Sequence, residues 1–309
     1  MDWFEIESPL LRARITARGA GLVGLWRAGW AQSLVLGTED PGVLLAAHPF
    51  AGTVVGPVAN RIGGARVTIA GRSYDLPANV GRNTLHSGPE GLHARDWSVT
   101  EHSMEALTLI CDLPDGACGL PGNRRVTAQF AVQGETLTVD LSATSDADTV
   151  MNLALHPYWT MTAGDTLQGH RLWLAAERFL SMTEDLLPSG ETKRLSALGL
   201  IPHHPAPIGD VPLDHNICLA PAPRPGAMFA ARLDGGASGP RLHLRTTAPG
   251  LQVYDGRDLP RVGRIGPYAG LALEPQMWPD APNHHGFPSI LLKAGAPWRQ
   301  TSAYRVELR

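Results

Sequence analysis

Two short segments of the chain each place one ionisable side chain at the end of an apolar run. Segment 271–275 reads LALEP and segment 153–157 reads LALHP, so Glu274 and His156 hold the same position in two nearly identical patterns. Side chains alternate between the two faces of a β-strand, so the leucines share one face while the alanine and the ionisable residue share the other. A carboxylate and an imidazole presented in this way can serve as a general base and a general acid.

The proline that follows each of these residues supports an extended conformation. Proline disfavours helical geometry for the residue before it, so Glu274 and His156 are expected at strand ends. The alternative interpretation is two ordinary core strands that end in polar residues, because most such side chains are simply solvated or hydrogen-bonded. The pattern alone leaves both interpretations open.

Short strands joined by turns are expected throughout the chain. The 34 glycines and 26 prolines are spread along the sequence, and no segment keeps a helical period for three turns. Apolar residues alternate in 126–132 and again in 137–143, which predicts a hairpin with one buried face. The only modest helix candidate is 192–199. Further strands or strand pairs are expected at 67–76, 97–113, 171–175, 227–233, 241–247 and 304–308.

These elements predict an all-β fold, a large antiparallel β-sandwich with few short helices, formed by residues 1–309 as a single domain. The hydrophobic content of 43% is ample for a core. Neither a linker nor a repeat of fixed period interrupts the chain.

Composition and charge narrow the possible partners and compartments. The net charge is −3 and no basic stripe occurs, which argues against nucleic acid as a partner. The most apolar window, 43–59, is interrupted by histidine and proline, so no membrane span is expected. The three cysteines match no redox or zinc spacing and no signal peptide is evident, so a cytoplasmic protein with reduced thiols is expected.

Several motifs that could bind a cofactor or a metal lack the context they need. Segment 19–24 fits GxGxxG, but no convincing helix follows it, so a glycine-rich turn is expected and no cofactor. The adjacent pairs His203-His204 and His284-His285 would point to opposite faces of a strand, so no metal site is expected. Only two lysines occur, which disfavours Schiff-base chemistry.

Three further residues could bind a polar ligand. Arg61 follows Asn60 and offers a planar fork for sugar or carboxylate oxygens, although a structural ion pair would explain it equally well. His86 lies in the loop 83–88, where its alternative role is turn chemistry. Asp214 begins a strand, and an Asx turn is its alternative role.

Taken together and in this order, these segments resemble the aldose 1-epimerase (galactose mutarotase) family. The resemblance extends from about residue 10 to the C-terminus, and its large β-sandwich fold agrees with the strand pattern. The matching segments are 58–62 (VANRI), 76–79 (LPAN), 83–88 (NTLHSG), 152–159 (NLALHPYW), 213–216 (LDHN), 274–276 (EPQ), 279–283 (PDAPN) and 287–289 (FPS).

The resemblance implies an isomerase that interconverts the anomers of free aldohexoses such as galactose or glucose without a cofactor. It implies Glu274 as general base, His156 as general acid and His86 as a second histidine near the ring oxygen. The two catalytic groups are expected on opposite sides of the sugar ring. The expected substrate-binding residues are Arg61, Asp214, Asn60 and Trp278.

The chain also departs from the family pattern, and rival functions remain open. Ser87 stands where the family often has glycine, segment 158–160 reads YWT in place of YFN, and Trp278 stands where a smaller aromatic residue or histidine is common. These departures leave the sugar preference open. The rivals are a non-catalytic sugar-binding domain, an epimerase for a phosphorylated hexose and, more distantly, a metal-dependent lyase or hydrolase. The expected partner is a small monosaccharide, and the protein is expected to be a monomer or homodimer.

Overall fold

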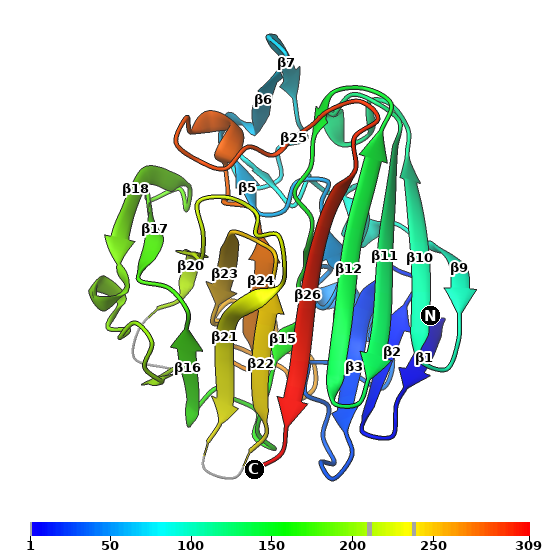
Figure 1. Ribbon diagram of the computed structural model, residues 1–309, viewed down its shortest axis with the longest axis vertical. Coiled ribbons are helices and arrows are strands. Elements are labelled where there is room, and N and C mark those ends of the chain that lie inside the picture. The colour runs from blue at the N-terminus through cyan, green and yellow to red at the C-terminus, as the bar shows by residue number, and fades with distance from the viewer. Residues whose placement is uncertain (1, 209–211, 237–238) are drawn as a thin grey trace.

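The computed structural model describes residues 2–208, 212–236 and 239–309, and these residues form an antiparallel all-β architecture (Figure 1). The largest sheet has nine strands in the order β19-β16-β21-β22-β26-β12-β11-β10-β9. Their bounds are β19 (Ala206–Pro207), β16 (His170–Leu174), β21 (Met228–Gly235), β22 (Arg241–Thr246), β26 (Trp298–Glu307), β12 (Thr136–Ser145), β11 (Arg124–Gln133), β10 (Ala106–Leu113) and β9 (Ser98–His102).

A second sheet of six strands, in the order β15-β24-β23-β20-β17-β18, contains the first segment singled out in the sequence. In Figure 1, β23 and β24 lie behind β21 and β22. The bounds are β15 (Tyr158–Trp159), β24 (Leu271–Gln276), β23 (Gly250–Tyr254), β20 (Asp214–Cys218), β17 (Arg178–Met182) and β18 (Pro188–Arg194).

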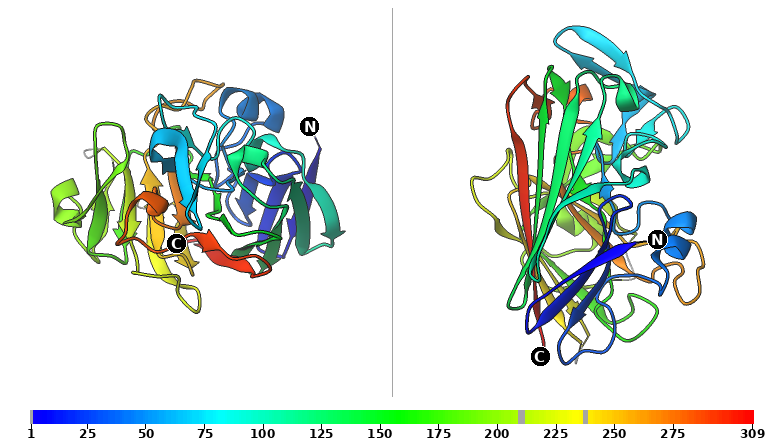
Figure 2. Two further views of the ribbon diagram at one scale, coloured as in Figure 1. Left: turned by 90° about the horizontal axis from the view of Figure 1, so that it is seen from above. Right: turned by 90° about the vertical axis from the view of Figure 1, so that its right-hand side faces the viewer.

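Smaller sheets and short helices complete the fold. Figure 2 shows the N-terminal strands and helix α1 on the same side of the nine-stranded sheet. The three-stranded sheet is β1 (Trp3–Glu7), β2 (Leu11–Thr16) and β3 (Gly21–Arg27). The strand pairs are β4 (Val54–Val55) with β14 (Ala154–Leu155), β5 (Arg61–Ile62) with β8 (Thr84–Leu85), β6 (Arg66–Ile69) with β7 (Arg72–Asp75), and β13 (Thr149–Val150) with β25 (Leu291–Leu292). The helices are α1 (Pro41–Ala47) and 3₁₀ turns at Gly63–Ala65, Leu92–Ala94, Ala117–Gly119, Leu195–Leu198 and Ala281–Asn283.

Most of the expected strands are confirmed. Strands β11 and β12 pair as a hairpin, with Gln133 opposite Thr136. The alternating residues of β11, from Val126 to Val132, point into the main core, which explains their period of two. Glycine-rich segment 19–24 leads into strand β3 instead of a helix, as expected for a turn.

The helix predictions were wrong in two places. Segment 192–199 forms the end of β18 and a 3₁₀ turn, which Gly199 ends in a left-handed conformation with φ 69°. The one α-helix in the described residues is α1, which the sequence analysis did not predict. Asp40 caps it by accepting a hydrogen bond from the Gly42 N–H, and Pro41 occupies its first turn. None of the described helices is both long and apolar enough to cross a membrane.

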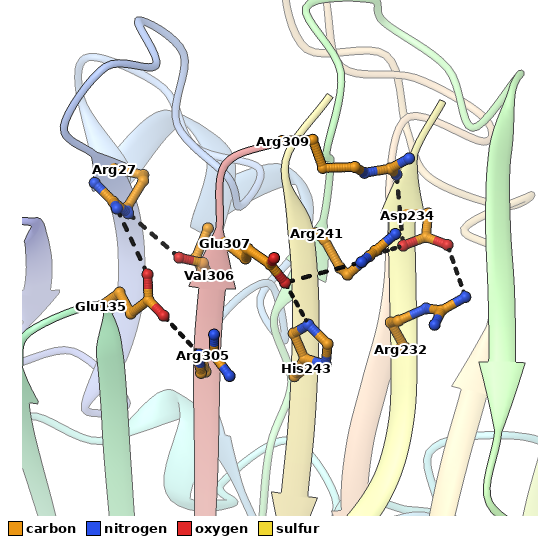
Figure 3. Close-up of polar contacts among 10 residues, drawn as sticks. All are labelled: Arg27, Glu135, Arg232, Asp234, Arg241, His243, Arg305, Val306, Glu307 and Arg309. Carbon is orange, nitrogen blue, oxygen red and sulfur yellow. Dashed lines mark hydrogen bonds and ion pairs between the residues drawn. The ribbon is translucent and has the colours of Figure 1, made fainter. Parts of the chain in front are cut away.

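Ion pairs link the C-terminal segment, strand β26 and Arg309, to neighbouring strands of the nine-stranded sheet (Figure 3). Asp234 on β21 pairs with Arg232, Arg241 and Arg309, at N–O distances of 3.2, 2.6 and 3.5 Å. Glu307 on β26 accepts a hydrogen bond from His243 at 3.0 Å. Single pairs of this kind contribute at most about 1 kcal/mol each, so the buried core, not this network, accounts for most of the stability.

A close backbone approach near the end of β21 requires glycine. A Cβ atom built on Gly235 would lie 1.7 Å from the carbonyl oxygen of Met161, whereas one built on Gly226 would meet nothing within 4 Å. Gly235→Ala is therefore expected to lower the free energy of unfolding by about 1–3 kcal/mol or more, because the backbone must shift. Chemical denaturation of both variants checks this. Gly226→Ala, the matched control, should change the free energy by less than about 0.5 kcal/mol; equal effects would contradict the packing described here.

Candidate active site

The six-stranded sheet presents polar side chains on one face and buries leucines on the other. On β24, Leu271 and Leu273 lie in the main core, while Ala272 and Glu274 occupy the opposite face. Glu274 stands directly across from Gln252 on β23, and Gln252 stands across from Asn216 on β20. The orientation expected for the segment 271–275 is therefore confirmed. The expectation that Glu274 ends its strand was wrong, because β24 continues through Pro275, whose extended backbone fits the sheet, to Gln276.

His156 reaches the same place from the end of β14. Leu153 and Leu155 lie in the main core, as the alternation predicted. The His156 N–H donates to the Thr53 carbonyl at 3.0 Å, and its carbonyl accepts from the Gly52 N–H at 2.8 Å. These two backbone bonds fix the residue from which the imidazole projects.

Glu274 and His156 meet directly. Their Oε1 and Nε2 atoms lie 3.5 Å apart, and both side chains are almost fully buried. The expectation that they stand on opposite sides of a sugar ring was therefore wrong, because a gap of 3.5 Å leaves no room for a ring between them. Both groups instead face a ligand from the same wall.

These two side chains line a cavity of about 200 Å³, which is smaller than the roughly 300–1,000 Å³ of sites for drug-sized ligands. Six of the seven site residues expected from the sequence line it: Asn60, Arg61, His86, His156, Asp214 and Glu274. The other lining residues are His48, Phe50, Leu85, Tyr158, Leu186, Gln252, Tyr254 and Asp258.

Trp278 is placed elsewhere. Its indole N–H donates to the Pro249 carbonyl at 3.1 Å and its ring contacts Phe287 edge-on. A Cβ atom on Gly250 would lie 3.0 Å from the Trp278 ring, so the indole occupies space that a side chain there would need. The structure thus does not bring Trp278 together with the other expected site residues.

Burial shifts the pKa values of Glu274 and His156 in opposite directions. Burial raises the pKa of the Glu274 carboxyl well above its usual value, the nearby Asp214 adds to this, and Arg61 opposes it. Burial lowers the pKa of the His156 imidazole to about 3, and His48 adds to this. Protonated Glu274 beside neutral His156 holds the same number of protons as ionised Glu274 beside protonated His156. The pair can therefore change between the two forms by moving one proton across the 3.5 Å contact.

The proton position on His86 is fixed by the backbone. Its Nδ1 accepts a hydrogen bond from the Asn60 N–H at 3.1 Å, so Nδ1 carries no hydrogen. Burial, together with His156 and other nearby cationic groups, lowers the pKa of His86 well below its usual value, so the ring is neutral. A neutral imidazole with a bare Nδ1 carries its hydrogen on Nε2, and His86 is therefore a donor at that atom.

Left-handed backbone geometry shapes the loops around His86. The φ angles of Asn60, His86 and Ser87 are 64°, 52° and 66°. The Ser87 hydroxyl accepts from the Val58 N–H at 2.8 Å and donates to the Val58 carbonyl at 3.2 Å. A left-handed residue other than glycine is strained, which accounts for the glycine that the family often has at position 87. The two hydrogen bonds stabilise serine in that position.

The hydrogen bonding of His86 argues against a metal ion at this site. Ligand atoms of His86, His156 and Glu274 lie within 4.8 Å of one another, which is close enough for a three-ligand cluster. The Nδ1 of His86 is occupied by a backbone N–H and its Nε2 carries a hydrogen, so neither nitrogen is free to ligate. Two remaining ligands fall short of the three that catalytic zinc sites use.

Arg61 and Asp214 face the cavity from different sheets. No described carboxylate lies within 4 Å of Arg61, so the ion pair considered from the sequence is not seen among the residues that the structure describes. Asp214 accepts a hydrogen bond from the Gln252 side-chain amide at 2.6 Å. Burial raises the pKa of Asp214, and Arg61 opposes this effect. The Asn60 side chain accepts from the Arg61 N–H at 2.8 Å and so supports the turn that carries the guanidinium.

Sequence reasoning missed five polar residues of the cavity: His48, Tyr158, Gln252, Tyr254 and Asp258. Tyr158 lies two residues after His156, and a period of two would have placed both on one face. Gln252 becomes visible only through its pairing with Glu274. His48 follows a short helix that the sequence analysis did not predict, so no local pattern pointed to it.

Known proteins show the same architecture over the whole chain. The profile of the family described as aldose 1-epimerase matches residues 2–305. The galactose mutarotases of Sus scrofa and Bos taurus are each 32% identical to this chain, covering 98% and 99% of it and 93% and 94% of their own lengths. The crystal structure of an aldose epimerase homologue from C. elegans superposes with a TM-score of 0.93 at 26% identity, covering 99% of both chains.

The raised pKa of Glu274 predicts how stability depends on pH. A group whose pKa is higher in the folded than in the unfolded state contributes stability below the unfolded pKa, and this contribution is lost as the pH rises toward the folded pKa. Between these two pKa values the free energy of unfolding falls by about 1.4 kcal/mol for each pH unit. Glu274→Gln removes this loss, because an amide has no proton to release. The variant should therefore become progressively more stable than the wild type as the pH rises from the usual carboxyl pKa of about 4.5 toward the raised pKa of the folded state.

Denaturant unfolding of both proteins across this pH range measures the difference. The exposed Glu105 serves as the control site. Glu105→Gln should show a difference from the wild type that hardly varies with pH. A pH-independent difference for Glu274→Gln would contradict the raised pKa.

Proposed function

The chain belongs to the aldose 1-epimerase family, and we propose that it interconverts the α and β anomers of free aldohexoses such as galactose or glucose. It is an isomerase with mutarotase function, as the family match over nearly the whole chain indicates. The observation that carries the proposed mechanism is the direct contact between Glu274 and His156 in a cavity of monosaccharide size.

The chemistry of a hemiacetal suits two groups that lie side by side. The hydroxyl oxygen that loses a proton and the ring oxygen that gains one are both bonded to the anomeric carbon. A base and an acid on one wall can therefore reach both oxygens at once. In this proposal Glu274 takes the proton from the anomeric hydroxyl while His156 protonates the ring oxygen. The aldehyde then rotates about its C1–C2 bond and closes on its other face, with both proton transfers reversed.

The remaining cavity residues bind and orient the sugar in this proposal. His86 donates its Nε2 hydrogen to a sugar oxygen near the ring oxygen, because its tautomer allows donation and not acceptance. Arg61 donates to hydroxyl groups, and Asp214 accepts from them while Gln252 holds its carboxylate in place. Trp278 is left out of this set because the cavity is lined without it.

The charges of the cavity favour a free sugar over a phosphorylated one. The lining residues include the three carboxyl groups of Asp214, Asp258 and Glu274, while Arg61 is the one guanidinium in the described lining. A phosphate dianion needs several convergent cations. A purely binding role is also disfavoured, because burying Glu274 beside His156 costs stability that binding alone does not require.

The structure also supports proposals on organisation and surroundings. We propose that residues 1–309 fold as one domain, since residues of both large sheets and of the N-terminal strands share one hydrophobic core. Cys111, Cys118 and Cys218 are free thiols, which suits a reducing cytoplasm. Three points complete the proposal: the sole partner is a small sugar, no cofactor is used, and the protein is a monomer or homodimer.

Mutarotation assays test this function directly. Freshly dissolved α-galactose and α-glucose should reach anomeric equilibrium much faster with the protein than without it, as followed by polarimetry. The 6-phosphates of the same sugars should gain little, because Arg61 is the one guanidinium that the described lining offers to a phosphate. Binding of galactose without faster mutarotation would support a non-catalytic sugar-binding domain. Preference for the 6-phosphates would support an epimerase for phosphorylated hexoses.

The catalytic pair can be tested by substitution. Glu274→Gln and His156→Ala should each lower kcat/KM for galactose by about 10²–10⁴-fold, because each removes one positioned proton transfer. His203→Ala is the control, since His203 is exposed and lies outside the cavity lining. A comparable loss in the His203 variant, or wild-type rates in the Glu274 variant, would show that the reaction occurs elsewhere.

A further inference from the structure

The cavity contains a hydrogen-bonded pair that the proposed mechanism does not use. The Nε2 atom of His48 lies 2.8 Å from the hydroxyl oxygen of Tyr158, and both residues line the cavity. Tyr158 is only 2% exposed, so its hydroxyl cannot be explained as a solvated surface group. A buried phenol normally completes its hydrogen bonding with protein or ligand partners.

Tyr158 is held beside the catalytic pair by strand pairing and packing. It stands across from Ala272 on β24, two residues before Glu274 and on the same face. Its ring centre lies 5.0 Å from that of His156. The ring packs in a small apolar cluster with Leu44 and Ala272, which fixes the direction in which the hydroxyl points.

Helix α1 positions His48 beside Tyr158. It is the C-cap residue of the helix, and its backbone N–H donates to the Leu44 carbonyl at 2.8 Å. Burial lowers the pKa of His48 to about 4, so the imidazole is neutral at physiological pH. In the tautomer that carries its hydrogen on Nδ1, the Nε2 of His48 is bare and accepts the hydrogen of the Tyr158 hydroxyl. The lone pairs of the Tyr158 oxygen then remain for a donor in the cavity.

We propose that His48 accepts the Tyr158 hydroxyl hydrogen at a bare Nε2, and that Tyr158, oriented in this way, determines sugar specificity by accepting a hydrogen bond from one ring hydroxyl other than the anomeric hydroxyl. The anomeric hydroxyl is excluded because Glu274 takes its proton. The pair adds an acceptor on the β15 side of Glu274, whereas Asp214 supplies one from the β20 side. Tyr158 and Asp214 thus accept hydrogen bonds from the sugar on two sides of its reacting carbon. This inference rests on the proposed mutarotase function.

A series of deoxy sugars identifies the hydroxyl that Tyr158 contacts. The kcat/KM values of the wild type and of Tyr158→Phe are compared for galactose and its 2-, 3-, 4- and 6-deoxy derivatives. The variant should be slower with galactose by about three- to tenfold, the loss of one hydrogen bond. For one deoxy sugar the ratio of wild type to variant should return to about one, because the contact is already absent.

Substitutions of His48 test whether it acts through Tyr158. His48→Gln keeps an acceptor for the tyrosine hydroxyl and should retain most of the activity, while His48→Leu should show the same sugar-dependent loss as Tyr158→Phe. In a Tyr158→Phe background, His48→Leu should add no further loss. Tyr74→Phe, on strand β7 outside the cavity lining, is the matched control and should match the wild type.

Specific outcomes would overturn the inference. They are an unchanged kcat/KM in Tyr158→Phe, an equal loss for all five sugars, or a His48→Leu effect that persists without the tyrosine hydroxyl. Thermal unfolding of each variant identifies losses of activity that come from misfolding. If Tyr158→Phe or His48→Leu misfolds, the other variant alone allows the comparison of sugars. A wild type without mutarotase activity would refute the proposed function instead, so the two failures are distinguishable.

Discussion

The structure of this site depends on the burial of a carboxyl group beside an imidazole. Glu274 and His156 lie 3.5 Å apart in a region that excludes water from both side chains. Burial disfavours the charged form of each group and therefore favours the neutral pair, from which the transfer of one proton across the contact produces the ionised pair. A solvated pair would instead settle in its ionised form. The leucine-rich strands behind both residues create this environment, so the core and the catalytic chemistry are parts of one arrangement.

Hydrogen bonds within the protein set which atoms of the cavity can donate and which can accept. The Asn60 N–H fixes the tautomer of His86, and the Gln252 amide holds the carboxylate of Asp214. Ser87, left-handed and next to His86, is stabilised by its two hydrogen bonds to the Val58 backbone. The cavity therefore presents defined donors and acceptors before a ligand arrives, which lowers the cost of ordering the site on binding.

Different contacts position the two segments 271–275 and 153–157. Glu274 lies within a sheet, where Gln252 on the neighbouring strand sets its register. His156 ends the two-residue strand β14 and is fixed by backbone bonds to segment 52–53. Two anchors that are far apart in the sequence thus converge on one contact.

The sequence by itself determined the local features: strand alternation, the direction of the leucines, and the chemical identity of Glu274, His156 and His86. The alternation follows from a period of two and from the prolines after Glu274 and His156, and neither needs a partner strand. Only the tertiary structure decided that the acid and base share one wall, that Trp278 lies outside the cavity and that His48 reaches Tyr158. Such distances depend on sheet order and register, which are set by contacts between segments far apart in the chain and leave no local pattern.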